Sequence, residues 1–393
     1  MKSVVLIINA GSSSIKFAIF TAVHLDCLFR GQIQGIGIND GCYFTLQDQT
    51  DKDRQSKQQI NADNHQHALE IIIQWLTEHQ KGFDLQAVGH RIVHGGNQFT
   101  EPVVIDEDVI RHLRKLVPLA PLHQPHNLAA IEIMRKLQPS LIQVACFDTA
   151  FHHTQPEIAK TFALPKSLYS EGVRSYGFHG LSYEYITSIL SEYSETAVTG
   201  RTIIAHLGHG ASLCAMNNSK SMATTMTFTP LDGLPMGTRC GSIDPAVVLY
   251  LLREKQLSVE DISELLHYQS GLLGLSGISG DMQELLNSQS SAAKTAIDVY
   301  VYRIICEIGK MSAAIQGLDS LVFTAGIGEH SALIREKICM GIEWLGIQIN
   351  VQANYRNEIK ISTEQSTISV WVIPTNEEKI IATHTYTLAL GGH

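Results

Sequence analysis

Apolar residues along this chain gather in short runs that end at clusters of glycine and serine. Residues 4–8 form an unbroken apolar run, which stops at the turn 9–14 and resumes at residues 15–20. A continuous β-branched run of this length is typical of a strand buried on both faces. The same order of strand, glycine turn and strand returns at residues 202–216, with the turn at residues 206–210. Two copies of one pattern predict a duplicated domain with a ligand held between its halves.

A third glycine turn, at residues 323–329, follows the apolar run 321–323. We predict a strand, this turn and then a helix over residues 331–340, where free N–H groups at a helix start would meet a nucleotide. Apolar spacing predicts further helices over residues 67–79, 109–117, 127–137 and 292–316. Residues 48–64 are polar without any apolar period, so we expect a surface loop there. The alternation of strands, glycine turns and helices predicts the α/β class.

The 393 residues are enough for two to three domains of about 150 residues each. Hydrophobic residues make up 44% of the chain, which is sufficient for more than one core. The formal net charge is −9, from 29 Lys and Arg against 38 Asp and Glu, and the sequence has no block of basic residues. This charge pattern argues against nucleic acid as a partner. An anionic ligand would have to be met by a few cations placed locally.

The seven cysteines are scattered and form no Cys-x-x-Cys pair. We therefore predict reduced thiols, and neither a disulfide framework nor a thiolate metal site. The apolar run 4–8 is shorter than the roughly 7–15 residues of a signal-peptide core. No stretch approaches the roughly 18–20 apolar residues of a membrane span. We expect a soluble, cytoplasmic protein without a membrane partner.

Two arginines lie in glycine-rich surroundings that suit the recognition of a small anion. Arg91 belongs to the segment HRIVHGG at residues 90–96, and Arg239 belongs to the long loop 229–241, which is rich in glycine and proline. An arginine fork matches a carboxylate or a phosphate, and long loops in compact domains are usually functional. For Arg91, a surface ion pair is the structural alternative.

Several acids and histidines near strand ends allow two interpretations each. Asp148 ends an apolar strand, where α/β proteins collect ligands, and it could equally cap a helix. Glu377 and Glu378 would either hold Mg²⁺ or begin the last helix, and taken singly the helix start is favoured. For His179 and His123 a structural role is the more common case. The 18 histidines show no His-Glu-x-x-His or similar spacing, so we expect no zinc or iron site.

Seven motifs occur in order along the chain: NAGSSSIK (9–16), HRIVHGG (90–96), ACFDTAFH (145–152), YGFHG (176–180), TPLDGLPMGTRCGSIDP (229–245), FTAGIGE (323–329) and IPTNEE (373–378). Together they resemble the acetate kinase (acetokinase) family over essentially the whole chain. The resemblance implies the duplicated, ribonuclease H-like fold of the sugar-kinase and actin-like ATPase superfamily, with a ligand cleft between two domains and usually a homodimer. It implies reversible transfer of a phosphoryl group from ATP to acetate, with Mg²⁺ or alternatively Mn²⁺ as the metal.

The resemblance also implies a role for each matching position. Arg91 and Arg239 would hold the acyl carboxylate and the moving phosphoryl group, and Asp148 would be the active-site acid. His179 would donate a hydrogen bond to that phosphoryl group, with support from His123. The remaining implied roles are the metal (Asn9, Glu377), the phosphates (Ser12, Ser14, Lys16) and the nucleotide (His206, Leu207, Gly208, His209, Gly210, Asp281, Met282, Gln283, Gly326, Ile327, Gly328, Glu329, His330).

Three positions depart from the family's pattern, and all three lie in the implied nucleotide site. His209 and His330 stand where the family usually has Asn, and Gln283 stands where Arg is common. Main-chain amides should still bind phosphates, so the departures bear on nucleotide affinity and base preference. The implied catalytic residues are all present, and we expect an active enzyme.

The duplication sets the expected domain boundaries. We predict an N-terminal domain of residues 1–149 with 374–393, and a C-terminal nucleotide-binding domain of residues 150–373. A hinge is expected near both crossings, with closure over the ligands to exclude water.

A small apolar pocket beside Arg91 would seat the acyl methyl group, and its expected residues are Val93, Leu122, Phe178 and Pro230. One extra methylene changes discrimination by only about 1–3 kcal/mol, so a propionate or butyrate kinase of the same family stays open as an alternative. A non-catalytic nucleotide-binding protein is the distant alternative.

Overall fold

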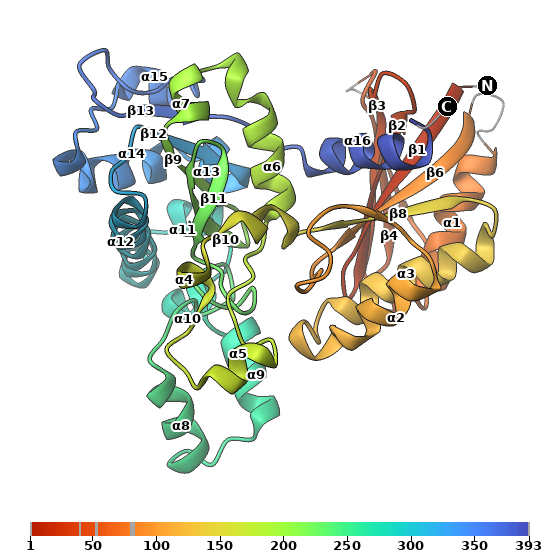
Figure 1. Cartoon of the computed structure of the whole chain (residues 1–393), viewed down its shortest axis with the longest axis horizontal. Coiled ribbons are helices and arrows are strands. Elements are labelled where there is room, and N and C mark those ends of the chain that lie inside the picture. The colour runs from red at the N-terminus through yellow and green to blue at the C-terminus, as the bar shows by residue number, and fades with distance from the viewer. Residues whose placement is uncertain (1, 39–40, 52–53, 79–82, 392–393) are drawn as a thin grey trace. The chain divides into compact units, whose positions relative to one another are not determined.

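The computed structural model describes residues 2–38, 41–51, 54–78 and 83–391. The chain forms two compact units: unit 1 is Met1–Phe151 with Asn376–His393, and unit 2 is His152–Thr375 (Figure 1). These limits lie two residues from the predicted domain boundaries at residues 149 and 373. The last helix therefore belongs to the unit formed by the first part of the chain.

Unit 1 is built around a mixed sheet in the order β5-β4-β3-β2-β1-β6-β8-β7. Its strands are β1 (Lys2–Ala10), β2 (Ser14–Thr21), β3 (Cys27–Gln34), β4 (Tyr43–Asp48), β5 (Gln55–Gln59), β6 (Phe83–Ile92), β7 (Val103–Val104) and β8 (Ile142–Phe147). Strands β1, β2 and β3 pair antiparallel, whereas β1, β6 and β8 run parallel. The apolar run predicted as a strand lies in the middle of β1, where Val4–Ile8 are at most 1% exposed.

Helices cover both faces of this sheet, which explains why β1 needs an unbroken apolar run (Figure 1). They are α1 (His65–Glu78), α2 (Glu107–Lys115), α3 (Gln124–Leu137) and α16 (Glu377–Ala389). Leu6 of β1 belongs to a core that includes Leu69 of α1. Its neighbour Ile7 lies against Gly89 of β6, where Ile381 of α16 also approaches. Successive residues of β1 thus face opposite helical layers.

Unit 2, all of whose residues are described, contains a five-stranded sheet in the order β11-β10-β9-β12-β13. Its strands are β9 (Arg201–Leu207), β10 (Ala211–Asn217), β11 (Lys220–Thr224), β12 (Ser320–Thr324) and β13 (Ser369–Val372). The first three strands pair antiparallel and the last three run parallel, as in β3-β2-β1-β6-β8 of unit 1. The glycine turn between β9 and β10 takes the place of the turn between β1 and β2. The predicted duplication is confirmed.

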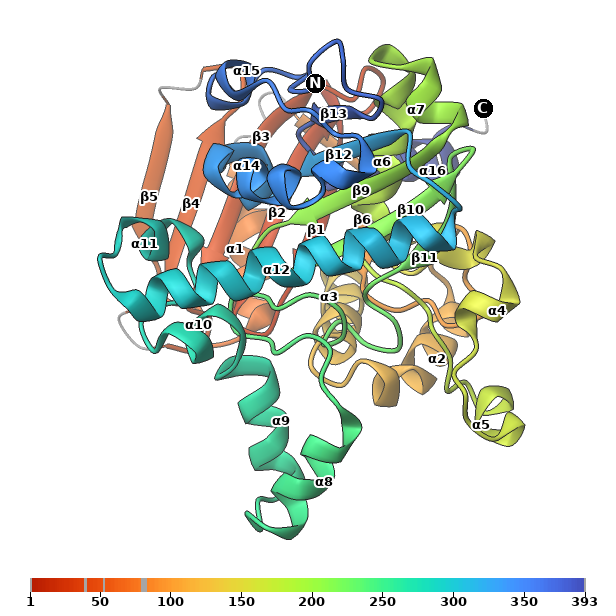
Figure 2. The same cartoon turned by 90° about the vertical axis from the view of Figure 1, so that its left-hand side faces the viewer.

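The helices of unit 2 position the ends of β9 and β10. They are α4 (Glu157–Lys160), α5 (Lys166–Ser170), α6 (Gly180–Ile189), α7 (Glu195–Thr199), α8 (Pro245–Arg253), α9 (Val259–Tyr268), α10 (Gly271–Ser276), α11 (Met282–Asn287), α12 (Ser291–Ala314), α13 (Ala325–His330), α14 (Ala332–Gly341) and α15 (Val351–Tyr355). The long helix α12 packs along β9, β10 and β11 (Figure 2). Helix α6 lies against β10, because Tyr183 hydrogen-bonds Ser212 and Thr187 hydrogen-bonds Met216.

The predicted helices are confirmed with small shifts at their ends. Helices α1, α2 and α3 begin two or three residues before the predicted starts, and α12 ends two residues before the predicted end. His79, the predicted end of α1, lies outside the described residues. The long loop is also confirmed, since residues 225–244, all described, contain no helix or strand. In the described ranges no helix combines the length and hydrophobicity that a bilayer crossing requires.

Two local predictions are wrong. Within the predicted loop 48–64, residues Gln55–Gln59 form β5, which pairs with β4 at the edge of the sheet (Figure 2). Every residue of β5 is exposed, so no apolar alternation marks this strand in the sequence.

The second wrong prediction is the glycine turn at residues 323–329. Helix α13 begins at Ala325, directly after β12, so the glycines of this stretch lie inside a short helix. Ala325 has a φ of +63°, and its N–H donates to Glu329 Oε1 at 2.8 Å. A side chain four residues ahead therefore caps the helix where the sequence indicated only a turn. The helix predicted next is confirmed as α14.

Candidate active site

Three charged side chains of unit 1 meet at the ends of three elements. Arg91 lies near the end of β6, Asp148 directly follows β8, and Glu377 begins α16. Arg91 donates two hydrogen bonds to Asp148: Nε donates to Oδ1 at 3.0 Å, and Nη2 donates to Oδ2 at 2.7 Å. The remaining nitrogen, Nη1, lies 3.3 Å from Glu377 Oε2. The fold thus brings together three candidates that are far apart in the sequence.

This ion cluster is largely buried, with Arg91, Asp148 and Glu377 side chains 20%, 3% and 18% exposed. Burial opposes the charge of Arg91 most strongly, but the carboxylates of Asp148 and Glu377 more than offset it. The pKa of Arg91 therefore lies above its ordinary value, and the side chain stays a cation. The two carboxylates hold the fork in one orientation, and an anionic ligand can use the N–H groups of Nη1 and Nη2 that these contacts leave.

A buried amide that the sequence analysis missed supports the same end of the sheet. Asn127 of α3, 3% exposed, donates from Nδ2 to the Ala10 carbonyl oxygen and accepts from the Val93 N–H, both at 3.0 Å. These two hydrogen bonds connect the end of β1 to the segment that follows Arg91. The signal in the sequence was a polar residue among the apolar positions of a predicted helix, since buried amides are nearly always hydrogen-bonded.

Four candidates lie at or beside the turn between β1 and β2, which is shorter than the predicted turn 9–14: Asn9 is in β1, Ser12 is in the turn, and Ser14 and Lys16 are in β2. The turn is closed by the Gly11 N–H, which donates to the Ser14 carbonyl oxygen at 2.8 Å. Lys16 is exposed and lines a cavity of about 250 Å³ together with Glu378. Because Glu378 follows Glu377, this cavity and the ion cluster share the start of α16.

Two of the residues predicted to seat the acyl group lie in unit 1, and two lie in unit 2. Val93 and Leu122 are half-buried in unit 1, Pro230 is half-buried in unit 2, and Phe178 in unit 2 is 1% exposed. His123, in unit 1, is half-buried at the position directly before α3.

In unit 2, His179 directly precedes α6 in a conformation that non-glycine residues rarely adopt. Its φ is +59°, in the left-handed region. Its Nδ1 is hydrogen-bonded to Ser212 Oγ at 2.8 Å, and its ring stacks on that of His206 with 4.2 Å between centroids. Strained backbones of this kind gather at functional sites, and here the strain comes with a ring held in one orientation.

Hydrogen bonds continue from His206 through two hydroxyl groups to the Glu329 carboxylate. We call His206, Ser182, Thr375 and Glu329 together the hydroxyl chain. His206 Nδ1 lies 2.8 Å from Ser182 Oγ, which lies 2.8 Å from Thr375 Oγ1. The Thr375 N–H donates to Glu329 Oε1 at 3.1 Å, the oxygen that also caps α13. The hydroxyl chain therefore joins α6, β9, α13 and the last residue of unit 2. No sequence motif marked Ser182, and Thr375 lay unremarked inside IPTNEE.

Arg239 reaches the glycine turn of unit 2 from the long loop. Its Nη1 donates to the Pro230 carbonyl oxygen at 2.7 Å. A Cβ atom on Gly210 would lie 2.7 Å from Arg239 Nη2 and 3.3 Å from His179 Nε2. Only a glycine at this position lets both side chains approach the turn so closely.

The nucleotide candidates of unit 2 adjoin the same turn. Gly208 packs near Ala325 of α13, with 3.5 Å between the two Cβ positions. The ring of His209 lies against Gly237 of the Arg239 loop, where a Cβ would be 2.3 Å from the ring. One departure from the family's pattern thus contacts the loop that carries a candidate catalytic cation.

The other two departures from the family's pattern, Gln283 and His330, have exposed side chains. Asp281 caps α11, with Oδ1 accepting from the Gln283 N–H at 2.8 Å; Met282 is buried, and the Gln283 side chain is exposed. His330 at the end of α13 is also exposed. The fully buried Arg335 donates a hydrogen bond to the Glu329 carbonyl oxygen of this helix at 2.9 Å.

The oxygen donors of unit 1 are compatible with Mg²⁺. Among the residues that the structure describes, no three His, Cys, Asp or Glu side chains are grouped as a metal site. A magnesium ion that accompanies a nucleotide usually takes only one or two carboxylates, with phosphate and water oxygens as the other ligands. The carboxylates of Asp148 and Glu377, on one arginine, provide donors of that kind.

Comparison with known sequences gives a full-length match. Residues 4–383 match the model of the Acetokinase family. The acetate kinase of Rhodopseudomonas palustris strain TIE-1 is 50% identical, with 100% of both chains covered. The acetate kinase of Rickettsia akari is 46% identical, with 97% of this chain and 98% of that protein covered.

Solved structures share the fold over the same extent. A propionate kinase from Francisella tularensis matches with a TM-score of 0.91 and 35% identity, covering 98% of this chain and 100% of that one. An acetate kinase from Porphyromonas gingivalis matches with a TM-score of 0.88 and 37% identity, covering 98% and 99%. Both units are therefore part of the shared fold.

Proposed function

The chain belongs to the acetokinase family, and from that premise we propose that it transfers the γ-phosphoryl group of ATP to acetate, giving acetyl phosphate and ADP reversibly. The observation that carries the proposal is the guanidinium of Arg91, oriented by Asp148 and Glu377. A second cation, Arg239, lies beside His179. Two oriented cations suit a reaction that has to bring a carboxylate and a triphosphate together.

The reaction needs charge neutralisation and positioning, and it needs no general base. Acetate is already an anion, so its oxygen attacks the γ-phosphorus without losing a proton. The new oxygen–phosphorus bond forms as the bond to the β–γ bridging oxygen breaks, and the electron pair leaves on ADP. Arg91 and Arg239 would hold the carboxylate and the moving phosphoryl group, while His179 donates to its oxygens and His123 supports it. Transfer is direct and in line, without a phosphoenzyme.

Asn9 and Glu377 would hold Mg²⁺, or Mn²⁺, in unit 1. When bound, the metal supplies positive charge to the phosphate oxygens. Asp148 acts through its two hydrogen bonds to Arg91, which keep the fork aimed.

The nucleotide would lie along the two glycine turns. Ser12, Ser14 and Lys16 would contact phosphates from unit 1, and residues 206–210, 281–283 and 326–330 would contact the nucleotide from unit 2. Backbone N–H groups at such turns bind phosphates whatever the side chains. The histidines at 209 and 330 and the glutamine at 283 then affect affinity and base preference and leave the transfer itself intact.

Hydroxamate formation from ATP, acetate and hydroxylamine tests the proposal. We expect steady product formation, with kcat/KM for acetate above that for propionate and butyrate. Absence of product with every short acid would contradict the proposal and favour a non-catalytic nucleotide-binding protein.

Propionate is the second candidate substrate, because the Francisella propionate kinase shares this fold at a TM-score of 0.91. The residues proposed to seat the acyl group are Val93, Leu122, Phe178 and Pro230. Since a methylene is worth only about 1–3 kcal/mol, the kcat/KM ratio between the two acids decides the preference.

We also propose a cytoplasmic homodimer. Helix α8 has no buried residue, although Val247, Leu249, Tyr250 and Leu252 are apolar and 37–51% exposed. Exposed apolar side chains gathered on one helix in this way are typical of a protein interface. Light scattering should give twice the chain mass, and Leu249→Glu should shift it toward one chain. The seven cysteines carry thiols, as expected in a reducing compartment.

A further inference from the structure

The turn between β1 and β2 is held by a histidine that lies outside the seven motifs. His65, the first residue of α1, places its Nε2 2.7 Å from the Gly11 carbonyl oxygen. A carbonyl oxygen can only accept, so Nε2 carries the proton of this hydrogen bond. His65 therefore donates to the turn as Nε2–H.

The fold restrains the His65 side chain from two directions. Asn64 caps the start of α1, because its Oδ1 accepts from the His67 N–H at 3.0 Å. The half-buried ring of His65 stacks on that of His126 in α3, with 5.3 Å between the centroids and 20° between the ring planes. The capped helix start and the stacked ring together hold the imidazole against the Gly11 carbonyl group.

The hydrogen bond from His65 sets the direction of the next backbone donor. In a planar trans peptide the C=O and N–H groups point in opposite directions, so a Gly11 carbonyl group aimed at α1 turns the Ser12 N–H away from α1. Ser12 and Ser13 are exposed, and within the described ranges neither of their N–H groups donates a hydrogen bond. Successive N–H groups at a turn form a concavity that binds anions. The contact with His65 thus directs a backbone donor toward the exposed side of the turn.

The peptide between Gly11 and Ser12 needs such a restraint because of the glycine. A glycine adopts positive and negative φ about equally well, so this peptide can rotate at low cost. A half rotation would place the carbonyl oxygen on the exposed side, where it would repel an anion. The preceding carbonyl group is restrained in the same manner, since Ala10 accepts from Asn127 of α3 at 3.0 Å. Helices α1 and α3, which pack against each other, thus hold two successive carbonyl groups of the turn.

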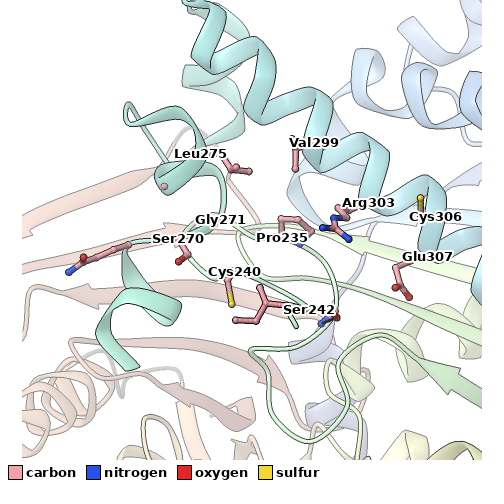
Figure 3. Close-up of a pocket in the computed structure, with 14 residues that line it drawn as sticks. Pro235, Cys240, Ser242, Ser270, Gly271, Leu275, Val299, Arg303, Cys306 and Glu307 are labelled. Carbon is pink, nitrogen blue, oxygen red and sulfur yellow. Dashed lines mark hydrogen bonds between the residues drawn. The ribbon is translucent and has the colours of Figure 1, made fainter. Parts of the chain in front are cut away.

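In unit 2 the corresponding turn is restrained by the backbone. Between β9 and β10, the His209 carbonyl oxygen accepts from the Gly237 N–H at 3.0 Å. The loop that supplies this donor is bonded to α10, because the Leu273 N–H donates to the Gly237 carbonyl oxygen at 3.0 Å. Figure 3 shows Pro235 of this loop and Gly271 at the start of α10 on the wall of one cavity. Both glycine turns therefore have a carbonyl group held from outside the turn, and in unit 1 the donor is a side chain.

We propose that His65 is a positioning residue for phosphate binding, since its bond to the Gly11 carbonyl oxygen keeps the Ser12 N–H directed at the phosphates of the nucleotide. This inference rests on the proposed function and adds to it a residue that acts through the backbone of the turn. Loss of the donor should weaken phosphate binding about five- to tenfold, as the loss of one neutral hydrogen bond does.

The test compares variants of the full-length protein in steady-state kinetics. His65→Phe keeps a ring that can stack on His126 and removes the donor, so it should raise KM for ATP about five- to tenfold. KM for acetate should stay within about twofold, because the turn is not assigned to the acyl group. His65→Gln should restore KM for ATP, since its amide N–H can donate in place of Nε2–H. His67→Ala, an exposed position on the same helical turn, is the matched control and should change neither KM.

A merely structural role of His65 would give a different result. A smaller folded fraction lowers kcat and leaves both KM values unchanged. That result, or an equal KM for ATP in wild type and His65→Phe, would overturn the positioning role. If His65→Phe failed to fold, His65→Leu would carry the same comparison, because it also lacks the donor.

Calorimetric titration with tripolyphosphate separates a failure of this inference from a failure of the proposed reaction. The probe has the phosphates of a nucleotide without base or acyl group, so its binding needs no turnover. His65→Phe should bind it about five- to tenfold more weakly than wild type, and His65→Gln should match wild type. Binding that depends on His65 in a protein without hydroxamate formation would overturn the proposed reaction and support the positioning role. Equal binding by wild type and His65→Phe, or none by wild type, would overturn the positioning role whatever the turnover.

Discussion

Unit 1 and unit 2 share one strand order, yet the polar groups after corresponding strands differ in kind. After β8 of unit 1 comes Asp148, a carboxylate bound to the guanidinium of Arg91. Beyond β13, which takes the same place in unit 2, Thr375 follows Ile373 and Pro374, and its hydroxyl is bound to Ser182. Duplication preserved the backbone frame, while the side chains near the strand ends diverged into an ion cluster in one unit and a hydroxyl chain in the other. We infer that the first orients a cation toward an anionic ligand and the second holds geometry.

The largest effect is expected from breaking the ion cluster. Arg91→Ala should lower kcat about 10²–10³-fold, as the loss of one oriented charge-stabilising group does. It should also destabilise the fold by about 3–5 kcal/mol, because Asp148, only 3% exposed, would keep a buried charge without its partner. Hydroxamate assays and urea unfolding measure the two effects.

The double variant Arg91→Ala with Asp148→Asn separates these effects. Removing the carboxylate charge should restore much of the stability and none of the activity. If the single variant were as stable as wild type, the cluster would not be the buried ionic site that distinguishes unit 1.

Arg239→Ala should lower kcat by a similar factor of about 10²–10³ with a much smaller change in stability. The guanidinium of Arg239 donates to a backbone carbonyl, so its removal leaves a neutral acceptor behind, at a cost near 1 kcal/mol. Arg239→Lys keeps the charge without the fork and should recover only part of kcat. Turnover close to wild type in both Arg239→Ala and Arg91→Ala would contradict the mechanism.

The strands, turns and long loop that the two units are built on could be predicted from the sequence, because they follow from local patterns. The run 4–8, the turn 206–210 and the loop 229–241 each follow from apolar continuity or glycine content. Strand β5 could not be predicted, since an exposed edge strand has no buried face to leave a pattern.

The residues of the candidate site likewise divide into those that the sequence indicated and those that it did not. Arg91, Asp148 and Arg239 lie in motifs with unusual composition, and these motifs indicated them. Ser182 acts through a partner 193 positions away, Thr375. Such a contact is a property of the folded chain, and a serine in a helix is too common to indicate it.

Buried histidines provide a pH-dependent test in both units. Burial lowers the pKa of His90 and His94 in unit 1, and of His152 in unit 2, to about 4 from the ordinary 6.5. Between these values the unfolded chain binds protons that the folded chain does not, so stability is complete above pH 6.5 and falls as the pH drops toward 4. Each of these histidines should lower the free energy of unfolding by up to about 1.4 kcal/mol for each pH unit below 6.5. Urea unfolding at pH 7 and 5.5 measures the change.

His152→Gln sharpens the pH test by removing the titrating group of unit 2. Its amide can still donate to the Phe178 carbonyl oxygen, which His152 Nε2 contacts at 2.9 Å. We expect a shallower loss of stability between pH 7 and 5.5 than in wild type. An identical slope would mean that His152 titrates normally in the folded protein.

The smallest effect is expected from the hydroxyl chain. Ser182→Ala removes the link between His206 and Thr375, a neutral hydrogen bond worth about 1 kcal/mol, so kcat should fall about fivefold. The KM for acetate should stay nearly constant, because the change loosens geometry around His179 and removes no charge. Ser182→Thr should restore kcat by returning the hydroxyl, and Ser188→Ala on the exposed side of α6 is the matched control. A loss of 10²-fold or more would show that unit 2 is as dependent on this chain as unit 1 is on its ion cluster, and the division of labour between charge and geometry would have to be abandoned.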